Sequence, residues 1–365
     1  MNILRRISLS RLLLLCGLVV AIGVSATAIA FALGAGPTPP PEPLAEAVHG
    51  ALSAPPVEGV SANIQLTNHL LEGANLASGS GEGGQLTQSP LLSGGSGRLW
   101  IAKDGSVRLE LQAEQGDTQV LYDGHTLEIY DAASNTLYRY TPPAHEPANT
   151  EVSPHHEIPT VAKIEEAISH LGEHANVSGA TPTDVAGQPA YTVRISPKEG
   201  GSLIGGAELS WDAVHGVPLR AAIYSSTSPA PVIELSTTSI SYGPVPASVF
   251  QFTPPPGAKV DELAASDDAA ARSDSGQHSA HAHPKVTVHG HGISGIAVVE
   301  AKVKPGSPSS ADTTEGLPKV SINGTSATEL ATELGTLLSF ERSGVRYVVL
   351  GSVTPAAVEA VARGL

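Results

Sequence analysis

Cysteine is almost absent from this sequence of 365 residues. The single cysteine, Cys16, lies within the first hydrophobic run, so the rest of the chain has no thiol to form a disulfide, to bind a metal as a thiolate or to act as a nucleophile. Aromatic residues are only 4% of the chain and charged residues 15%, whereas it contains 38 glycines and 29 prolines. A chain with few large rings and many turn residues is typical of a β-dominated protein.

Positive charge is scarce as well. The formal net charge is -15 and the isoelectric point is about 5.3. Because proteins that bind nucleic acids draw most of their affinity from Lys and Arg, this balance argues against a nucleic-acid partner.

The short motifs of common enzymes are also missing. The G-x-S-x-G nucleophile elbow does not occur. The glycine-rich run at residues 79–84 has no Lys-Ser/Thr end for binding phosphate, and His155, His156 and Glu157 do not have the i, i+4 histidine spacing of a zinc protease. We therefore expect a protein that is not an enzyme and that needs no cofactor.

The N-terminal segment has the pattern of an export signal. Arg5, Arg6 and Arg11 precede an apolar run at residues 12–33, which is about long enough to span a bilayer. Residues 1–35 are thus predicted to be a signal peptide or an N-terminal membrane anchor, and both alternatives stay open. The rest of the chain is predicted to be extracytoplasmic, either anchored to the cell membrane by this single transmembrane segment or secreted after signal cleavage. A proline-rich stalk is predicted at residues 36–43.

The region of residues 44–260 shows mainly the alternation of β-strands. A short helix is expected from Leu44, and the strand at residues 60–67 alternates apolar and polar residues. A meander of short strands follows at residues 98–140, then a helix after Thr160, further strands up to residue 225, and final strands that end at VFQFT before a run of three prolines. The predicted fold class is therefore mainly β (α+β), with one large curved antiparallel sheet covered by a few helices.

The C-terminal part is predicted to form a separate unit. Residues 261–284 lack an apolar period and are predicted to be an acidic, His-containing linker. Residues 285–365 contain several short strands and a last helix with Thr354 at its cap and Pro355 at its first position, which predicts a small α+β domain.

Four motifs occur in the order expected of a known family: LYDGHTLEIYDAASNTLYRY, VAGQPAYTVRIS, SWDAVHGVPLRAAIYS and VFQFTPPPGAKV. With them, residues 44–260 resemble the LolA-like fold of lipoprotein carriers and RseB-type envelope sensors. In that resemblance a hairpin between two central strands takes Asp212, Gly216, Pro218, Leu219 and Arg220. The resemblance implies a half-barrel, and the C-terminal piece is similar to small domains attached to extracytoplasmic bacterial regulators.

An apolar half-barrel predicts a cavity for acyl chains of lipids or lipoproteins, because such tails need no directed polar groups. The alternative, that the same residues pack an ordinary core, stays open. The predicted lining residues are Leu99, Ile101, Leu109, Leu127, Ile129, Val193, Ile195, Leu209, Trp211 and Ile223 from the strands, with Ile164 and Ile168 from the covering helix.

Two other functions are compatible with the sequence. The first is a regulatory module, similar to RseB, that binds a membrane protein such as an anti-sigma factor. The second is a metal-binding envelope protein, because histidines cluster near the predicted linker, although a solvated spacer explains them as well. These histidines are His278, His281, His283, His289 and His291.

Overall fold

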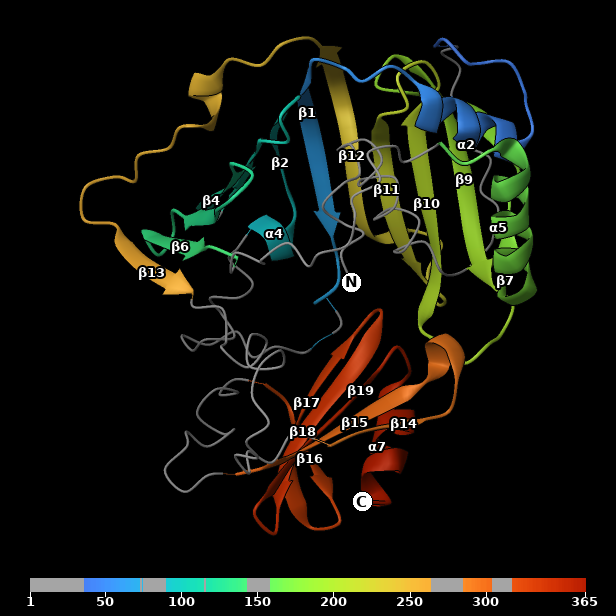
Figure 1. Cartoon of the computed structure of the whole chain (residues 1–365). Helices are drawn as coiled ribbons and strands as arrows, with labels where there is room; N and C mark the ends of the chain where they lie inside the picture. The colour runs from blue at the N-terminus through green and yellow to red at the C-terminus, as the bar shows by residue number, and fades with distance from the viewer. Residues whose placement is uncertain are drawn as a thin grey trace, which may run out of the picture.

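The computed structural model describes residues 36–72, 74, 90–114, 116–142, 158–263, 285–303 and 317–365. The predicted N-terminal signal or anchor and most of the predicted linker lie outside these residues. Within them the chain forms two β-sheets and a few helices (Figure 1).

The larger sheet has 13 strands in the order β13-β6-β5-β4-β3-β2-β1-β12-β11-β10-β9-β7, with β8 paired to β9. All neighbours are antiparallel except β13 and β6, which run parallel. Its strands are β1 (Gly59–Asn68), β2 (Gly95–Ala102), β3 (Val107–Ala113), β4 (Gly116–Tyr122), β5 (Leu127–Asp131), β6 (Thr136–Tyr140), β7 (Ala175–Val177), β8 (Thr181–Val185), β9 (Gln188–Pro197), β10 (Ile204–Asp212), β11 (Pro218–Ser225), β12 (Pro231–Tyr242) and β13 (Lys259–Leu263).

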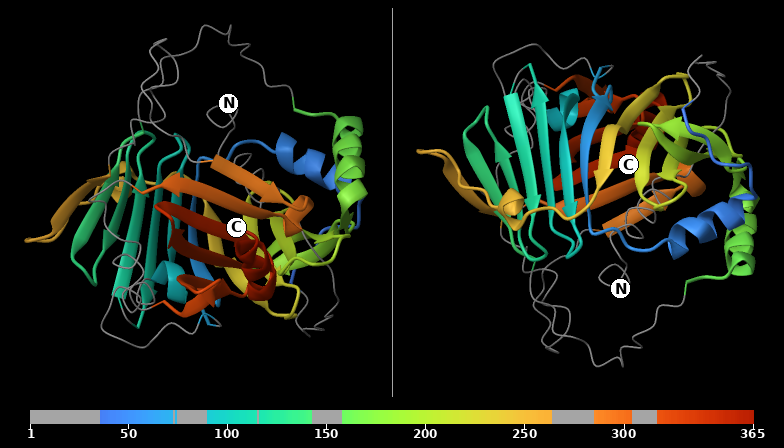
Figure 2. Two further views of the ribbon diagram at one scale, coloured as in Figure 1. Left: turned by 90° about the horizontal axis from the view of Figure 1, so that it is seen from below. Right: turned by 90° about the horizontal axis from the view of Figure 1, so that it is seen from above.

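Few helices cover this sheet. They are α2 (Leu44–Ser53), α4 (Pro90–Ser93) and α5 (Val161–His174). Both views in Figure 2 show the sheet bending, with α2 and α5 together at its β9 end. Ala47 and Ala51 of α2 pack on β9 and β10, and Leu171 of α5 packs against the same core. Thr160 caps α5, the helix predicted after it, because its side chain accepts a hydrogen bond from the Lys163 amide.

The smaller sheet has six strands in the order β14-β15-β19-β18-β17-β16. These are β14 (Lys285–His289), β15 (Ile296–Lys302), β16 (Lys319–Ile322), β17 (Thr325–Thr332), β18 (Gly335–Arg342) and β19 (Val345–Gly351). One face packs on α7 (Pro355–Arg363), where Val298, Leu338, Val349 and Val358 are fully buried. The predicted fold class, a mainly β chain with one large sheet, few helices and a small α+β unit, is confirmed.

The end of the large sheet differs from the prediction. The strand predicted at VFQFT is wrong, because Ala247–Phe250 form the 3-10 turn η1 and no strand follows until β13. Pro246 precedes the turn and three prolines follow it, and these four residues have no amide hydrogen to donate to a ladder. The segment lies over β3 and β5 instead: Arg108 Nη1 donates to the Val249 carbonyl at 2.8 Å, and the rings of Tyr130 and Phe252 are 5.2 Å apart.

The structure has three further features that the sequence did not predict. β13 pairs with β6 as far as Leu263, past the expected boundary at residue 260. Pro39, in the predicted stalk, is buried, and the Pro40 carbonyl accepts a 2.7 Å hydrogen bond from the Tyr191 hydroxyl. In the small sheet β17 was not expected, because TSATELAT has no clear alternation.

Candidate ligand-binding groove

One face of the large sheet carries an apolar side chain at almost every second position. Leu99 of β2 is paired with Ala62 of β1, which in turn faces Ile240 of β12. Farther along the sheet, Leu209 of β10 is paired with Ala221 of β11. Because residues directly opposite each other in an antiparallel pair share a face, the ladder carries one apolar surface across these five strands.

A cavity of about 300 Å³ opens on this surface between β1, β2 and β10–β12. Its lining is apolar apart from Glu208, Arg220 and Thr237, and strand alternation directs the first two side chains to the opposite face. We call this cavity the groove. The lining residues are Val60, Ala62, Ile64, Leu99, Ile101, Ala207, Glu208, Leu209, Val217, Pro218, Leu219, Arg220, Ala221, Ala222, Ile223, Ile233, Leu235, Thr237 and Ile240.

The groove is partly open to solvent. Leu235 keeps 38% of its surface exposed although it is a large apolar residue. At the β9 end the same face is closed by α2, and near β1 and β3 it is covered by Leu91 of α4. The groove is therefore the part of the apolar face that the helices leave uncovered.

The structure separates the residues that the sequence predicted as a cavity lining. Leu99, Ile101, Leu209 and Ile223 line the groove. The other sheet residues of the set share the face but lie elsewhere on it. Val193, Ile195 and Trp211 are buried in the core below α2, Leu109 packs against the core next to the groove, and Leu127 and Ile129 lie half-buried on β5.

The two predicted helix residues lie away from the groove, on α5. Ile164 is buried and Ile168 is half-buried. Neither residue lines the groove.

Sequence reasoning missed the contribution of β1 and β12. Val60, Ala62 and Ile64 come from β1, and Ile233 and Leu235 come from β12. Their alternation with polar residues is visible in both segments. What the pattern does not contain is the pairing of β1 with β12, which brings the two ends of the domain together.

A turn anchored by Asp212 borders the groove between β10 and β11. The Asp212 side chain is fully buried and accepts hydrogen bonds from the amides of Val214 and His215 at 2.7 and 2.9 Å. Its second oxygen accepts from the Tyr242 hydroxyl at 2.5 Å and lies 3.2 Å from His215 Nδ1. Burial alone would raise the pKa of Asp212, but the hydrogen bonds from Tyr242, His215 and Val214 hold it below its ordinary value. The Asp212 backbone amide also donates to the carbonyl of Val217 at 2.8 Å, and Val217 lines the groove.

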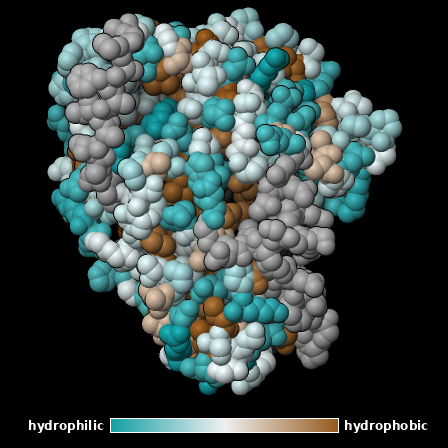
Figure 3. Space-filling view, turned by 180° about the vertical axis from the view of Figure 1, so that it is seen from behind, coloured by the Kyte–Doolittle hydropathy of each residue, from teal (hydrophilic) through white to brown (hydrophobic). Residues whose placement is uncertain are grey.

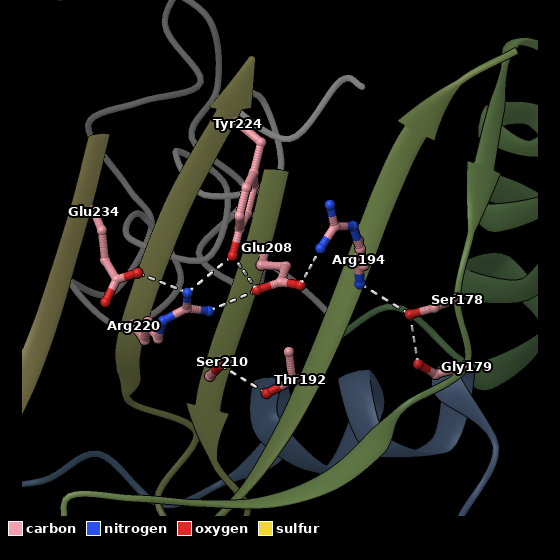
Figure 4. Close-up of polar contacts among 9 residues, drawn as sticks. All are labelled: Ser178, Gly179, Thr192, Arg194, Glu208, Ser210, Arg220, Tyr224 and Glu234. Atoms are coloured by element: carbon pink, nitrogen blue, oxygen red, sulfur yellow. Dashed lines mark hydrogen bonds and ion pairs between the residues drawn. The ribbon is translucent and has the colours of Figure 1, made fainter. Parts of the chain in front are cut away.

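A charged network lies on the opposite face of the strands that line the groove (Figure 4). Arg220 of β11 bridges Glu208 of β10 and Glu234 of β12, with nitrogen to oxygen distances of 2.7 Å to each. Glu208 also accepts from Arg194 and from the Tyr224 hydroxyl, both at 2.7 Å.

The ionised forms of this network are favoured. Burial would raise the pKa of Glu208, but hydrogen bonds from Arg220, Tyr224 and Arg194 lower it. Burial would lower the pKa of Arg220, but Glu234 and Glu208 raise it. The network therefore ties β9, β10, β11 and β12 together behind the groove.

The surface away from the view of Figure 1 is mainly hydrophilic, with small hydrophobic patches between (Figure 3). Among the described residues, no group of three or more His, Asp or Glu side chains has the arrangement of a metal site. His289 and His291 are exposed at the end of β14, whereas His278, His281 and His283 lie outside the described residues. None of the described helices is long and apolar enough to cross a membrane.

The comparisons with known proteins give similar solved structures only. A chain of the complex of Pseudomonas aeruginosa MucA and MucB is 16% identical, with 87% of this chain and 94% of that chain covered and a TM-score of 0.40. MucB by itself is 15% identical over the same shares, with a TM-score of 0.38. A LolA superfamily protein from Nitrosomonas europaea is 9% identical and covers 58% of this chain and 99% of that chain, with a TM-score of 0.21.

No protein-family model matches the sequence, and no curated protein matches it.

Proposed function

We propose that this chain binds acyl chains of a lipid or lipoprotein in the groove, outside the cytoplasm, as a carrier or a sensor. The observation that carries the proposal is an apolar cavity of about 300 Å³ that the helices leave open, which is within the usual size range of ligand sites. Its walls present almost no polar group that could orient a polar ligand. Each methylene removed from water contributes about 0.8 kcal/mol to the free energy of binding. An acyl chain is therefore the ligand that such walls stabilise most.

The site has no feature of catalysis among the described residues. The buried polar groups nearest the groove, Asp212 and Glu208, are engaged by hydrogen bonds that hold neighbouring strands. They point to the turn and to the opposite face, so they do not face a ligand in the groove. Binding without chemical conversion is therefore the function that the site supports best.

The first experiment asks whether the chain carries a lipid. The protein is released in native form from the producing cells, its lipid is extracted with organic solvent and quantified per chain, and the emptied protein is titrated with a fluorescent long-chain fatty acid. We expect lipid in a fixed ratio and saturable binding of the fatty acid.

A matched pair of variants locates the site. Leu235→Glu places a charge in the groove and is expected to abolish lipid binding, because an unpaired carboxylate in an apolar site costs several kcal/mol. Leu350→Glu is the control, since Leu350 is 39% exposed against 38% for Leu235 and belongs to the small sheet. A folded wild-type chain without lipid and without fatty-acid binding would contradict the proposal and favour recognition of a membrane protein instead.

A further inference from the structure

β14 forms one end of the small sheet and is paired on one side only (Figure 1). Its one neighbour among the described strands is β15. Val286 and Val288 on β14 are 60% and 62% exposed, which is more than the large apolar residues on the other strands keep. This strand therefore presents unpaired backbone groups together with uncovered valines.

The usual protections of a free edge are missing from β14. Within its five residues there is no proline and no bulge. Its one charged side chain, Lys285, is held by Glu300 of β15 at 2.9 Å. An edge without such protection is a template for pairing with a further strand.

We propose that β14 pairs antiparallel with β14 of a second copy of this chain, centred on Thr287. In this register Thr287 lies opposite its own copy, Val286 lies opposite Val288, and Lys285 lies opposite His289. All five residues are then paired, and the valines of both copies stay on one face, where each contacts a valine of the other chain.

Other registers fit the strand less well. A shift by one residue turns the apolar face of the second copy to the other side, because side chains alternate along a strand. A shift by two residues keeps the face but leaves part of the strand unpaired. At its C-terminal end the strand stops at His289, since Gly290 leaves the extended conformation with φ +85°.

Charge does not oppose this contact. The chain as a whole carries a formal charge of -15, but lysines and arginines nearly balance glutamates in the small sheet and α7. The unit that carries β14 therefore adds little net charge to a contact between two copies.

A disulfide scan tests the register. In a full-length Cys16→Ser background, cysteine is introduced one position at a time as Val286→Cys, Thr287→Cys or Val288→Cys. Opposite residues of an antiparallel pair have Cα atoms roughly 4.5–5.5 Å apart, within the range that a disulfide spans. We expect Thr287→Cys to give a linked dimer on mild oxidation, at least about tenfold faster than the other two variants.

The control lies on the free edge of the large sheet. Val260 of β13 is also an exposed edge valine, at 44%, so Val260→Cys reports chance collisions. A linked dimer that forms as fast through Val260 as through Thr287 would overturn the proposal. A dimer that links best through Val286 or Val288 would overturn the Thr287 register.

Sedimentation of the full-length chain in a density-matched detergent tests the dimer without a covalent link. We expect a dimer that Val288→Lys converts to a monomer, with lipid content unchanged, whereas Val260→Lys stays dimeric. A wild-type chain that is monomeric overturns the proposal and leaves lipid binding in the groove unaffected, because the two experiments concern different sheets.

Discussion

At the scale of single residues, the turn between β10 and β11 depends on two positions. Gly216 adopts a φ of +66°, and a Cβ added there would lie well inside contact distance of the Ala51 carbonyl of α2. Asp212 closes the same turn from within, through bonds to two amides and two side chains. Gly216 thus allows the turn to lie close to α2, and Asp212 holds the turn that leads to Val217.

Replacement of Gly216 by alanine is expected to destabilise the chain more than an equivalent change elsewhere. Gly124 also has a positive φ, +92°, but nothing lies within 4 Å of an added Cβ. Gly124→Ala should therefore cost about 1–2 kcal/mol for the backbone conformation alone. Gly216→Ala should cost about 1–3 kcal/mol more because it overpacks a backbone oxygen. Urea unfolding of the two variants measures the difference, and equal losses would contradict the argument.

Acid is expected to weaken the fold through Asp212 and Glu208. Both carboxyls have a pKa below the ordinary value in the folded chain. Their stabilisation is thus fully present above the unfolded pKa, about 4, and is lost as the pH falls through the folded pKa. The free energy of unfolding, measured by urea titration at a series of pH values, should fall below about pH 4. The Asp212→Asn variant should be less stable at neutral pH, and its free energy of unfolding should fall less steeply in acid. If that fall is the same as in the wild-type chain, Asp212 does not contribute to the acid sensitivity.

At the scale of elements, the groove has walls made by strands from both ends of the domain. β1 and β12 contribute from one side, and β10 and β11 from the other. Arg220 links β10, β11 and β12 on the opposite face through Glu208 and Glu234. The network thus positions strands whose apolar residues form the groove.

Removal of Arg220 is expected to loosen these strands. The side chains of Glu208 and Glu234 are about four-fifths buried, and Arg220→Met removes an ion pair from each of them. Breaking a fully buried ion pair lowers the free energy of unfolding by about 3–5 kcal/mol. Because these side chains are partly solvated, we expect Arg220→Met to lower it by about 2–3 kcal/mol.

The control for Arg220→Met is an exposed ion pair. Lys103 and Glu58 have side chains 58% and 61% exposed, and Lys103→Met should change the free energy of unfolding by about 0–1 kcal/mol. Unfolding curves measure both variants. We also expect Arg220→Met to weaken fatty-acid binding, and an equally small effect of both substitutions would refute the positioning role.

At the scale of the whole molecule, hydrogen bonds between described residues join segments that flank the two sheets. The Leu203 amide and the Ser202 hydroxyl donate to the Ser352 carbonyl at 2.7 and 3.0 Å. The Glu333 amide donates to the Leu70 carbonyl at 3.4 Å. The two units that these hydrogen bonds join each have a hydrophobic core of their own.

Limited proteolysis tests the predicted division of the chain. Arg272 falls in the predicted linker at residues 261–284, between Lys259 on β13 and Lys285 on β14. We expect trypsin to cut first after Arg272, because backbone held in a sheet resists the protease. Mass spectrometry of early time points identifies the cut, and first cleavage within either sheet would contradict the predicted domains.

Local patterns in the sequence were enough to indicate most of the strands and helices. Apolar alternation in β1 and β3, the cap at Thr160 and the proline at residue 355 indicate strands and helices through local physics that a short window contains. The prediction was wrong at Ala247–Phe250, where aromatic and β-branched residues are typical of a strand but a 3-10 turn forms, next to prolines that cannot donate to a ladder.

The position of the groove follows from strand pairing and helix packing, which no local pattern contains. Ser61 and Ser241 are 180 residues apart and yet are neighbours in the sheet. Alternation shows that a strand has an apolar side. It does not show which strand lies next to it in the sheet, or which part of the apolar face a helix covers. For that reason Leu99 and Val193 are alike in the sequence, whereas one lines the open groove and the other is buried below α2.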